Sequence, residues 1–412
     1  MKNSDYLCFN IFFFLLFIAG CTSEKEPDIP DHIQHLTNLT VHPMDAEPEF
    51  SIQIEQDQNF GETEEVLIGS FIGNMAVDNS GRVYITDRSQ GIHVYDADGT
   101  YLQRVGRDGA GPGEFQSPSS IRFTDDNLIV MDLSQPKVSL FDLESYAHIK
   151  DISLSIDDDA ANVPAWMEST QEEGLTYQAI DYYGNSDGNV LVIFGHSGVG
   201  NLQNRNRRTW EISLLDLSEG RFLKHDILSV EDVIDVLALE EGGAITSILF
   251  LPKTQIEITA NHYIYSNSND MLFKFYDKDG DYSHAFYHPY SKVALTLNDA
   301  VDYMQNLLGD HDEIIDRVTS SILNSEIPQS WPVFNTFVVD DKNRLWIPTI
   351  IDDTEAYEWW VLDEDGELLA SYTWPRDKVV KVVNDGMLYA LETDEKTGLQ
   401  QVVRYDIQIT TN

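Results

Sequence analysis

The chain has 412 residues, of which 42% are hydrophobic and 11% are aromatic. This composition excludes a disordered chain, because a sequence this rich in apolar side chains can bury a packed core. The formal charge of −44, from 70 acidic and 26 basic residues, excludes nucleic-acid binding by phosphate neutralisation, which needs clustered lysines and arginines. We therefore expect a folded protein with no nucleic-acid partner.

The amino terminus has the pattern of a secretion signal. Lys2 precedes an apolar run, Leu7–Ile18, that is too short for an ordinary membrane-spanning helix and suits a signal-peptide core. An isoleucine, an alanine and a glycine then lead into Cys21, an ending that resembles the lipobox of bacterial lipoproteins. The resemblance implies that residues 1–20 are removed and that Cys21 carries a lipid anchor in the cell envelope. A plain secretory signal is the alternative.

Residues 21–48 are acidic and contain several prolines, so we expect a lipidated, extended tether between the membrane and the folded domain. The chain has two cysteines. Cys8 leaves with the signal peptide and Cys21 is lipidated, so no thiol remains for a disulfide, a zinc site or a nucleophile.

Residues 49–412 contain a repeated unit of short strands. It is clearest at Met75–Ile85, where two strands flank a polar turn, followed by an aromatic-rich third strand and a second turn in Ile92–Gly99. Five further copies follow, each recognised by a turn that leads into its second strand. These turns and strands lie at Asp125–Val130, Asn185–Val192, Ala260–Tyr265, Asp340–Ile347 and Asn384–Tyr389.

Repeated antiparallel modules with alternating apolar residues predict an all-β fold, a six-bladed β-propeller with four-stranded blades. One blade cannot bury both of its faces, so blades must pack face to face around an axis. The last unit lacks a fourth strand, whereas Phe50–Ile54 is an alternating strand without a partner. We therefore predict that this N-terminal strand completes the final blade and closes the ring.

The segment Gly106–Phe115, followed by Pro118 and Ile121, resembles the inter-blade signature of NHL-type propellers. Together with the lipobox and the Trp331-Pro332 pair, it is similar to the six-bladed NHL-like and TolB-like propeller lipoproteins of Bacteroidetes-type bacteria. The resemblance implies a fold and a location in the cell envelope, and no single activity.

The long connections of such a propeller should open on one face, here called the top face. They lie at 155–176, 196–208, 226–252 and 288–333, around blades three to five. The last contains apolar residues at helical spacing, which predicts a small two-helix insertion over about 293–325, between blades four and five. Long ordered loops on a rigid scaffold commonly carry binding sites.

Three arginines stand within four positions of one such loop, at Arg205, Arg207 and Arg208, next to Trp210. Guanidinium groups can hold a carboxylate, sulfate or phosphate through forked hydrogen bonds, so this group is a candidate ligand site. The alternative is that the arginines pair with local acids such as Glu211 and only stabilise the loop.

Further candidates come from polar residues on or near the predicted first strands, which line a propeller's channel. Asn74, Gln255 and Asn335 are the amides that we assign as possible ligand contacts. The alternative is that such residues only hold channel water.

Two classes of function remain open. The favoured one is a noncatalytic, membrane-anchored module that binds a small anionic or polymeric ligand, or an envelope protein, at the top face of blades three to five. The other is a propeller enzyme of the metal-dependent lactonase, hydrolase or lyase type, for which Glu257 and Asp181 are the acids on first strands. We assign no catalytic residue, cofactor or metal ligand, because the histidines at 284 and 288 lie too far apart for one ion.

Overall fold

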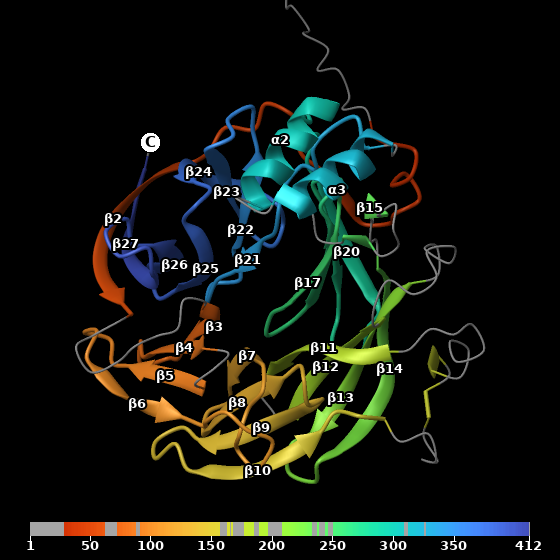
Figure 1. Cartoon of the computed structure of the whole chain (residues 1–412). Coiled ribbons are helices and arrows are strands. Elements are labelled where there is room, and N and C mark those ends of the chain that lie inside the picture. Colours follow the sequence, from red (N-terminus) through yellow and green to blue (C-terminus); the bar gives the residue numbers. More distant parts are fainter. Residues whose placement is uncertain are drawn as a thin grey trace, which may run out of the picture.

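The computed structural model describes residues 29–61, 72–87, 91–156, 163–164, 166–167, 177–184, 189–196, 208–232, 237–238, 244–245, 250–308, 312–324 and 327–411. These ranges are mostly β-strands, in sheets that stand around a central axis (Figure 1). No helix within them is both long and apolar enough to cross a membrane. The predicted signal peptide, residues 1–20, and Cys21 lie outside the described residues.

The first three sheets each contain four antiparallel strands in chain order, with the first strand nearest the axis (Figure 1). Polar turns separate strands whose alternate side chains are apolar, the pattern that antiparallel sheets require. The bounds are β3 Ile72–Val77, β4 Val83–Asp87, β5 Gly91–Tyr95, β6 Tyr101–Val105, β7 Pro118–Phe123, β8 Asn127–Asp132, β9 Lys137–Asp142, β10 His148–Ser153, β11 Tyr177–Gly184, β12 Asn189–His196, β13 Thr209–Asp216 and β14 Arg221–Glu231.

The remaining sheets follow the same plan with additions. A fourth sheet, β17–β20, gains β1 on its outer edge, and β21–β24 joins β25–β27 through the N-terminal strand β2 into one eight-stranded sheet. A two-stranded ribbon, β15–β16, stands apart. The bounds are β1 Leu39–Val41, β2 Phe50–Phe60, β15 Leu237–Ala238, β16 Ala244–Ile245, β17 Thr254–Ile258, β18 Tyr263–Asn267, β19 Leu272–Tyr276, β20 Tyr282–Tyr287, β21 Val338–Val339, β22 Leu345–Ile350, β23 Ala356–Leu362, β24 Leu368–Pro375, β25 Val379–Asn384, β26 Met387–Thr393 and β27 Gln400–Thr411.

Two helices, α2 Leu297–Leu308 and α3 Asp312–Leu323, stand between β20 and β21, in the segment where the sequence predicts them. A reciprocal capping pair begins α2, because Thr296 Oγ1 accepts the Asp299 N–H at 3.2 Å while Asp299 Oδ2 accepts the Thr296 N–H at 2.8 Å. Ala300 and Met304 of α2 and Val318 and Ile322 of α3 pack into the core shared with β22 and β23.

The hydrophobic core consists of clusters between neighbouring sheets. One cluster joins Ala76 and Tyr84 of the first sheet to Ile121 and Leu128 of the second, and similar clusters follow around the axis. Another joins the last sheet to the first through residues of β4, β26 and β27. The sheets thus form a closed ring, which buries faces that a single sheet would leave exposed.

The N-terminal strand closes this ring as the sequence predicts. β2 pairs antiparallel with β27 from Phe50↔Thr411 to Phe60↔Val402, so it is the fourth strand of the last sheet. Phe50 and Ser51 also pair in parallel with β24 of the neighbouring sheet. The edge that β27 would otherwise expose is therefore covered.

Residues 29–48 differ from the expected extended tether. They dock on the outside of the β17–β20 sheet, where β1 pairs in parallel with β20 and Ile33 is 1% exposed (Figure 1). His42 stacks on His288 with ring centroids 4.4 Å apart and bonds to the Asp365 carbonyl. We call residues 29–48 the strap. The few apolar residues of the strap are sufficient to dock it on this sheet, because β20 offers a free edge and a shallow apolar surface.

Candidate functional site

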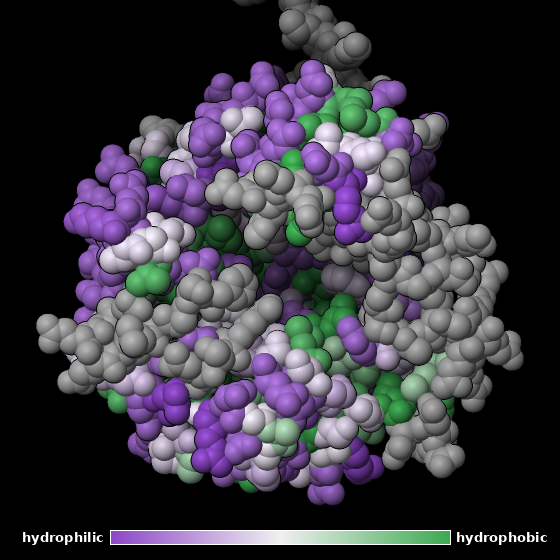
Figure 2. All heavy atoms as spheres, viewed as in Figure 1, coloured by the Kyte–Doolittle hydropathy of each residue, from purple (hydrophilic) through white to green (hydrophobic). Residues whose placement is uncertain are grey.

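The first strands of the sheets surround a central channel that opens on the hollowed face in Figure 2. Two cavities lie along it. The upper cavity, about 360 Å³, is lined by Asp181, Tyr183, Lys253, Gln255 and Glu257, among others. The lower cavity, about 560 Å³, is lined by Arg122, Tyr183, Glu257 and Lys381, among others. Tyr183 and Glu257 belong to both cavities, so they mark the waist where the two meet.

The waist is built from three neighbouring first strands, β7, β11 and β17. Arg122 Nη2 lies 3.5 Å from Asp181 Oδ2, and its guanidinium stands 4.8 Å from the Tyr183 ring centroid. Ser120 donates a hydrogen bond to Asp181 at 2.9 Å, and Tyr183 donates one to the Ile256 carbonyl at 3.0 Å. These contacts fix a charged pair and an aromatic ring across the boundaries between sheets.

Glu257 is the least paired acid of the waist. Gln255 Nε2 lies 3.4 Å from its Oε1, and the described residues give it no ion pair within 4 Å. Burial raises the pKa of Glu257 to about 7, against the opposing effect of Arg122 and with a further rise from Asp181. A carboxyl group in this environment is partly protonated at neutral pH, so it can donate a hydrogen bond as well as accept one.

Two lysines add positive charge to the channel. Lys253 Nζ donates to Asn335 Oδ1 at 2.8 Å, whereas Lys381 Nζ makes no hydrogen bond or ion pair within the part of the chain that the structure describes. Burial lowers the pKa of both lysines, and Lys381 lowers that of Lys253 further by like-charge repulsion. With Arg122, the channel is therefore lined by three cations and by three carboxyls, those of Asp181, Glu257 and the exposed Asp125.

The amides assigned from the sequence connect neighbouring sheets. Asn74 Nδ2 donates to the Ser119 carbonyl at 2.7 Å. Gln255 donates to the Phe337 carbonyl at 2.6 Å and accepts the Phe337 N–H at 3.0 Å. Asn335 accepts from Lys253 across the same boundary between sheets. Asn74 and Gln255 line the channel, but they use much of their hydrogen-bonding capacity in bonds that connect neighbouring sheets.

The arginine group is divided. Arg208 Nε donates to Asp232 Oδ2 at 3.0 Å, and its Nη2 donates to the His196 carbonyl at 3.3 Å, so this arginine matches the structural alternative. Burial raises the pKa of Asp232, with Arg208 opposing. Trp210 lines the upper cavity, which places this residue at the channel. Arg205 and Arg207 lie outside the described residues.

Arg122, Lys253 and Lys381 were missed by the sequence analysis, because simple alternation does not place all of them in the channel. The pairing of first and second strands shifts register at Pro118/Ser120, Ala179/Asp181 and Val380/Val382. A β-bulge of this kind inserts one residue and changes which side chains face the axis. The available signal was the presence of basic residues near predicted first strands, in a chain that contains few basic residues.

A family model described as "6-bladed beta-propeller" matches residues 62–204, about a third of the chain. No curated protein matches the sequence. Three solved structures are similar in fold. A protein named "Putative exported protein" from Bacteroides fragilis is 12% identical, with a TM-score of 0.49 over 91% of this chain and 99% of that one. A luciferin-regenerating enzyme is 11% identical (TM-score 0.40; 86% and 95% covered). The Cps50 (Swd1) propeller domain of Myceliophteria thermophila is 9% identical (TM-score 0.42; 86% and 100%).

The sheet topology and the family match define the class: the chain is a β-propeller protein. At such low identities the similar structures transfer no activity to it. Its function has to be argued from the channel.

Proposed function

We propose that this chain is a six-bladed propeller lipoprotein of the cell envelope, and that its channel binds a small organic anion without transforming it. The six blades are β3–β6, β7–β10, β11–β14, β17–β20, β21–β24 and β25–β27 with β2. Lipid on Cys21 would hold the protein at the membrane.

The observation that carries the binding function is the enrichment of basic residues in the channel. The whole chain has 70 acidic and 26 basic residues, whereas the channel is lined by three cations and three acids, one of them partly protonated. A partly buried ammonium group without a carboxylate partner is costly, as at Lys381. A bound carboxylate would supply the missing partner, so this arrangement favours an anionic ligand.

Calorimetric titration with galacturonate and inorganic phosphate tests this proposal. We expect Lys381→Ala to weaken anion binding at least tenfold, because it removes an ammonium group that has no partner among the described residues. Lys396→Ala is the matched control, since Lys396 is exposed on the β26–β27 turn. Equal affinity in the wild type and the Lys381 variant, or no binding by the wild type, would contradict an anion site in the channel.

The arginine loop remains part of this proposal as a second contact at the top face. Trp210 lines the upper cavity, and Arg207 lies three positions before it. Charge reversal by Arg207→Glu should then reduce retention on an immobilised anion. Unchanged retention would assign Arg207, like Arg208, to loop structure.

A second candidate function is acid–base catalysis, favoured by the Glu257 carboxyl. Groups whose pKa lies near neutrality are concentrated at catalytic sites, and Arg122 and Tyr183 stand beside this one. Under this alternative a channel ligand is turned over, and Glu257→Gln abolishes turnover while leaving binding in place. Recovery of unchanged ligand after prolonged incubation would favour simple binding.

A further inference from the structure

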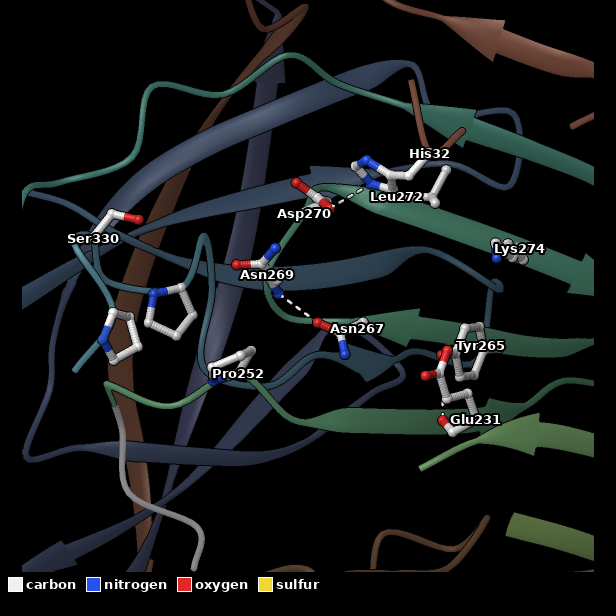
Figure 3. Close-up of a pocket in the computed structure, with 12 residues that line it drawn as sticks. His32, Glu231, Pro252, Tyr265, Asn267, Asn269, Asp270, Leu272, Lys274 and Ser330 are labelled. Atoms are coloured by element: carbon white, nitrogen blue, oxygen red, sulfur yellow. Dashed lines mark hydrogen bonds and ion pairs between the residues drawn. The ribbon is translucent and has the colours of Figure 1, made fainter. Parts of the chain in front are cut away.

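A third cavity of about 490 Å³ lies at the rim of the β17–β20 sheet (Figure 3). The strap contributes His32, and the sheet contributes Tyr265, Asn267 and Lys274. We call it the rim pocket. It lies at the end of the sheet where β17 begins and β18 ends, which is the end at which Lys253 enters the channel. The rim pocket and the upper cavity therefore open toward the same face.

One part of the rim pocket contains one positive and one negative side chain, Lys274 and Glu231. Lys274 Nζ stands 5.6 Å from the centroid of the Tyr265 ring, and it makes no hydrogen bond or ion pair among the described residues. Burial lowers the pKa of Lys274, and the exposed carboxylate of Glu231 partly offsets this effect. Figure 3 shows Tyr265, Glu231 and Lys274 grouped together. Like Lys381 in the channel, Lys274 has room for an anionic group.

The other part is lined by polar groups, among them the carboxylate of Asp270 (Figure 3). Asn269 donates its backbone N–H to Asn267 Oδ1 at 2.8 Å, and the strap closes this side through a 2.9 Å contact between His32 and Asp270. The amide nitrogens of Asn267 and Asn269 and the hydroxyl of Ser330 make no hydrogen bond within the described ranges. These donors suit the hydroxyl and ring oxygens of a sugar.

The two cavities are separated by a very short piece of chain. Pro252 lines the rim pocket, whereas the next two residues, Lys253 and Thr254, line the upper cavity. Thr254 Oγ1 donates to the Glu231 carbonyl at 2.9 Å, which ties this piece to the end of β14. Only one or two residues of this wall therefore separate a ligand bound in one cavity from the other cavity.

We infer that the rim pocket and the channel are two subsites for one extended ligand, an acidic oligosaccharide, that crosses from the rim pocket into the upper cavity over Pro252–Thr254. This inference rests on the proposed anion-binding function. Each subsite supplies a lysine for a carboxylate, and the rim pocket adds amide and hydroxyl donors. An extended peptide fits less well, because it would be expected to add to a sheet edge, and β1 already covers the outer edge of β20.

Titration with galacturonic acid and its linear oligomers of two to six units tests the two subsites. For the wild-type protein we expect affinity to rise at least tenfold from monomer to hexamer, because the longer chain reaches both lysines. Lys274→Ala should abolish this gain while changing monomer affinity less than twofold. Lys381→Ala should weaken all lengths.

Lys278→Ala is the matched control. Lys278 also lies over a tyrosine ring, 5.1 Å from the centroid of Tyr263, but it is exposed and stands at the opposite end of the same sheet, where it bonds to the Thr259 carbonyl. It should leave the length dependence unchanged.

The outcomes separate the two proposals. Monomer binding that depends on Lys381, without any gain for longer oligomers, overturns the two-subsite inference and leaves the channel site standing. No monomer binding overturns the channel site itself. If hexaglutamate shows the length gain that depends on Lys274 and oligogalacturonate does not, the oligosaccharide assignment is wrong.

Discussion

Asp340, in the β21–β22 turn, organises the start of the fifth sheet, and its removal should be among the most damaging single changes. Its side chain is 0% exposed. Oδ1 accepts the N–H groups of Lys342 and Arg344 at 2.9 and 2.8 Å, and Oδ2 accepts Arg344 Nε at 2.7 Å and Trp346 Nε1 at 2.9 Å. Asp78, Arg82 and Tyr84 repeat this arrangement in the first sheet.

In Asp340→Ala the indole N–H of Trp346 stays buried without an acceptor, and the Arg344 guanidinium loses its ion partner. Breaking a buried, hydrogen-bonded ion pair costs about 3–5 kcal/mol, a large part of the roughly 5–15 kcal/mol that stabilises a typical domain. Asp340→Asn should cost nearly as much, because its amide nitrogen would face two other donors.

Urea unfolding, followed by tryptophan fluorescence, measures the loss in the free energy of unfolding. Asp363 provides the control, since among the described residues its side chain accepts only the N–H groups of Asp365 and Glu367, in an equivalent turn, and it is partly exposed. Asp363→Ala should cost about 1 kcal/mol. Equal losses at Asp340 and Asp363 would refute the claim that the buried side-chain partners, rather than the turn, determine the effect.

Three further predictions concern the channel, the strap and the anchor. Anion affinity should fall as pH rises through about 7, where Glu257 ionises and repels the ligand, and Glu257→Gln should flatten the profile. The folded-state pKa of Glu257 is raised above its unfolded-state pKa. The stability that this carboxyl contributes is therefore fully present below the unfolded-state pKa and is lost as pH rises toward 7. The free energy of unfolding of Glu257→Gln should then vary less with pH over this range. Ile33→Asp should release the strap and expose residues 29–41 to protease while the ring stays folded, because Ile33 packs only on the outside of the β17–β20 sheet; unchanged protection would contradict this docking. Cys21→Ala should move the protein from the membrane fraction to the soluble fraction of cells, and persistent membrane association would contradict a lipid anchor on Cys21.

The sequence predicted the strands well because each carries its own signal. Turns such as Asp78–Gly81 stand between apolar runs, and Gly81 has a positive φ of 77°, a conformation that glycine adopts without strain. The pairing of Phe50–Ile54 with the last sheet was also predictable, since one strand lacked a partner and one sheet lacked a strand.

The residues of the channel could be predicted only in part. Gln255 and Glu257 follow plain alternation on β17, and β17–β18 pairing shows no register shift. Lys381 lies between Val380 and Val382, where the β25–β26 pairing shifts, so alternation alone does not decide which way it faces. A bulge depends on how two strands pair, and one strand does not contain that information.

The strap shows the same limit at larger scale. Its sequence is acidic and rich in proline, and the sparse apolar residues Ile33, Leu39 and Val41 have no pattern that distinguishes them from a tether. Ile33 becomes buried, and Leu39 and Val41 partly buried, only because Leu272 and Tyr287 of a distant sheet present an edge and a surface to them.

The local sequence thus determined the class of the fold, since strand periodicity and turn chemistry are properties of short segments. The tertiary structure decided which charges share the channel and where the amino terminus docks. These features depend on contacts between residues far apart in the chain, whose geometry is set by strand register and by the packing of neighbouring sheets.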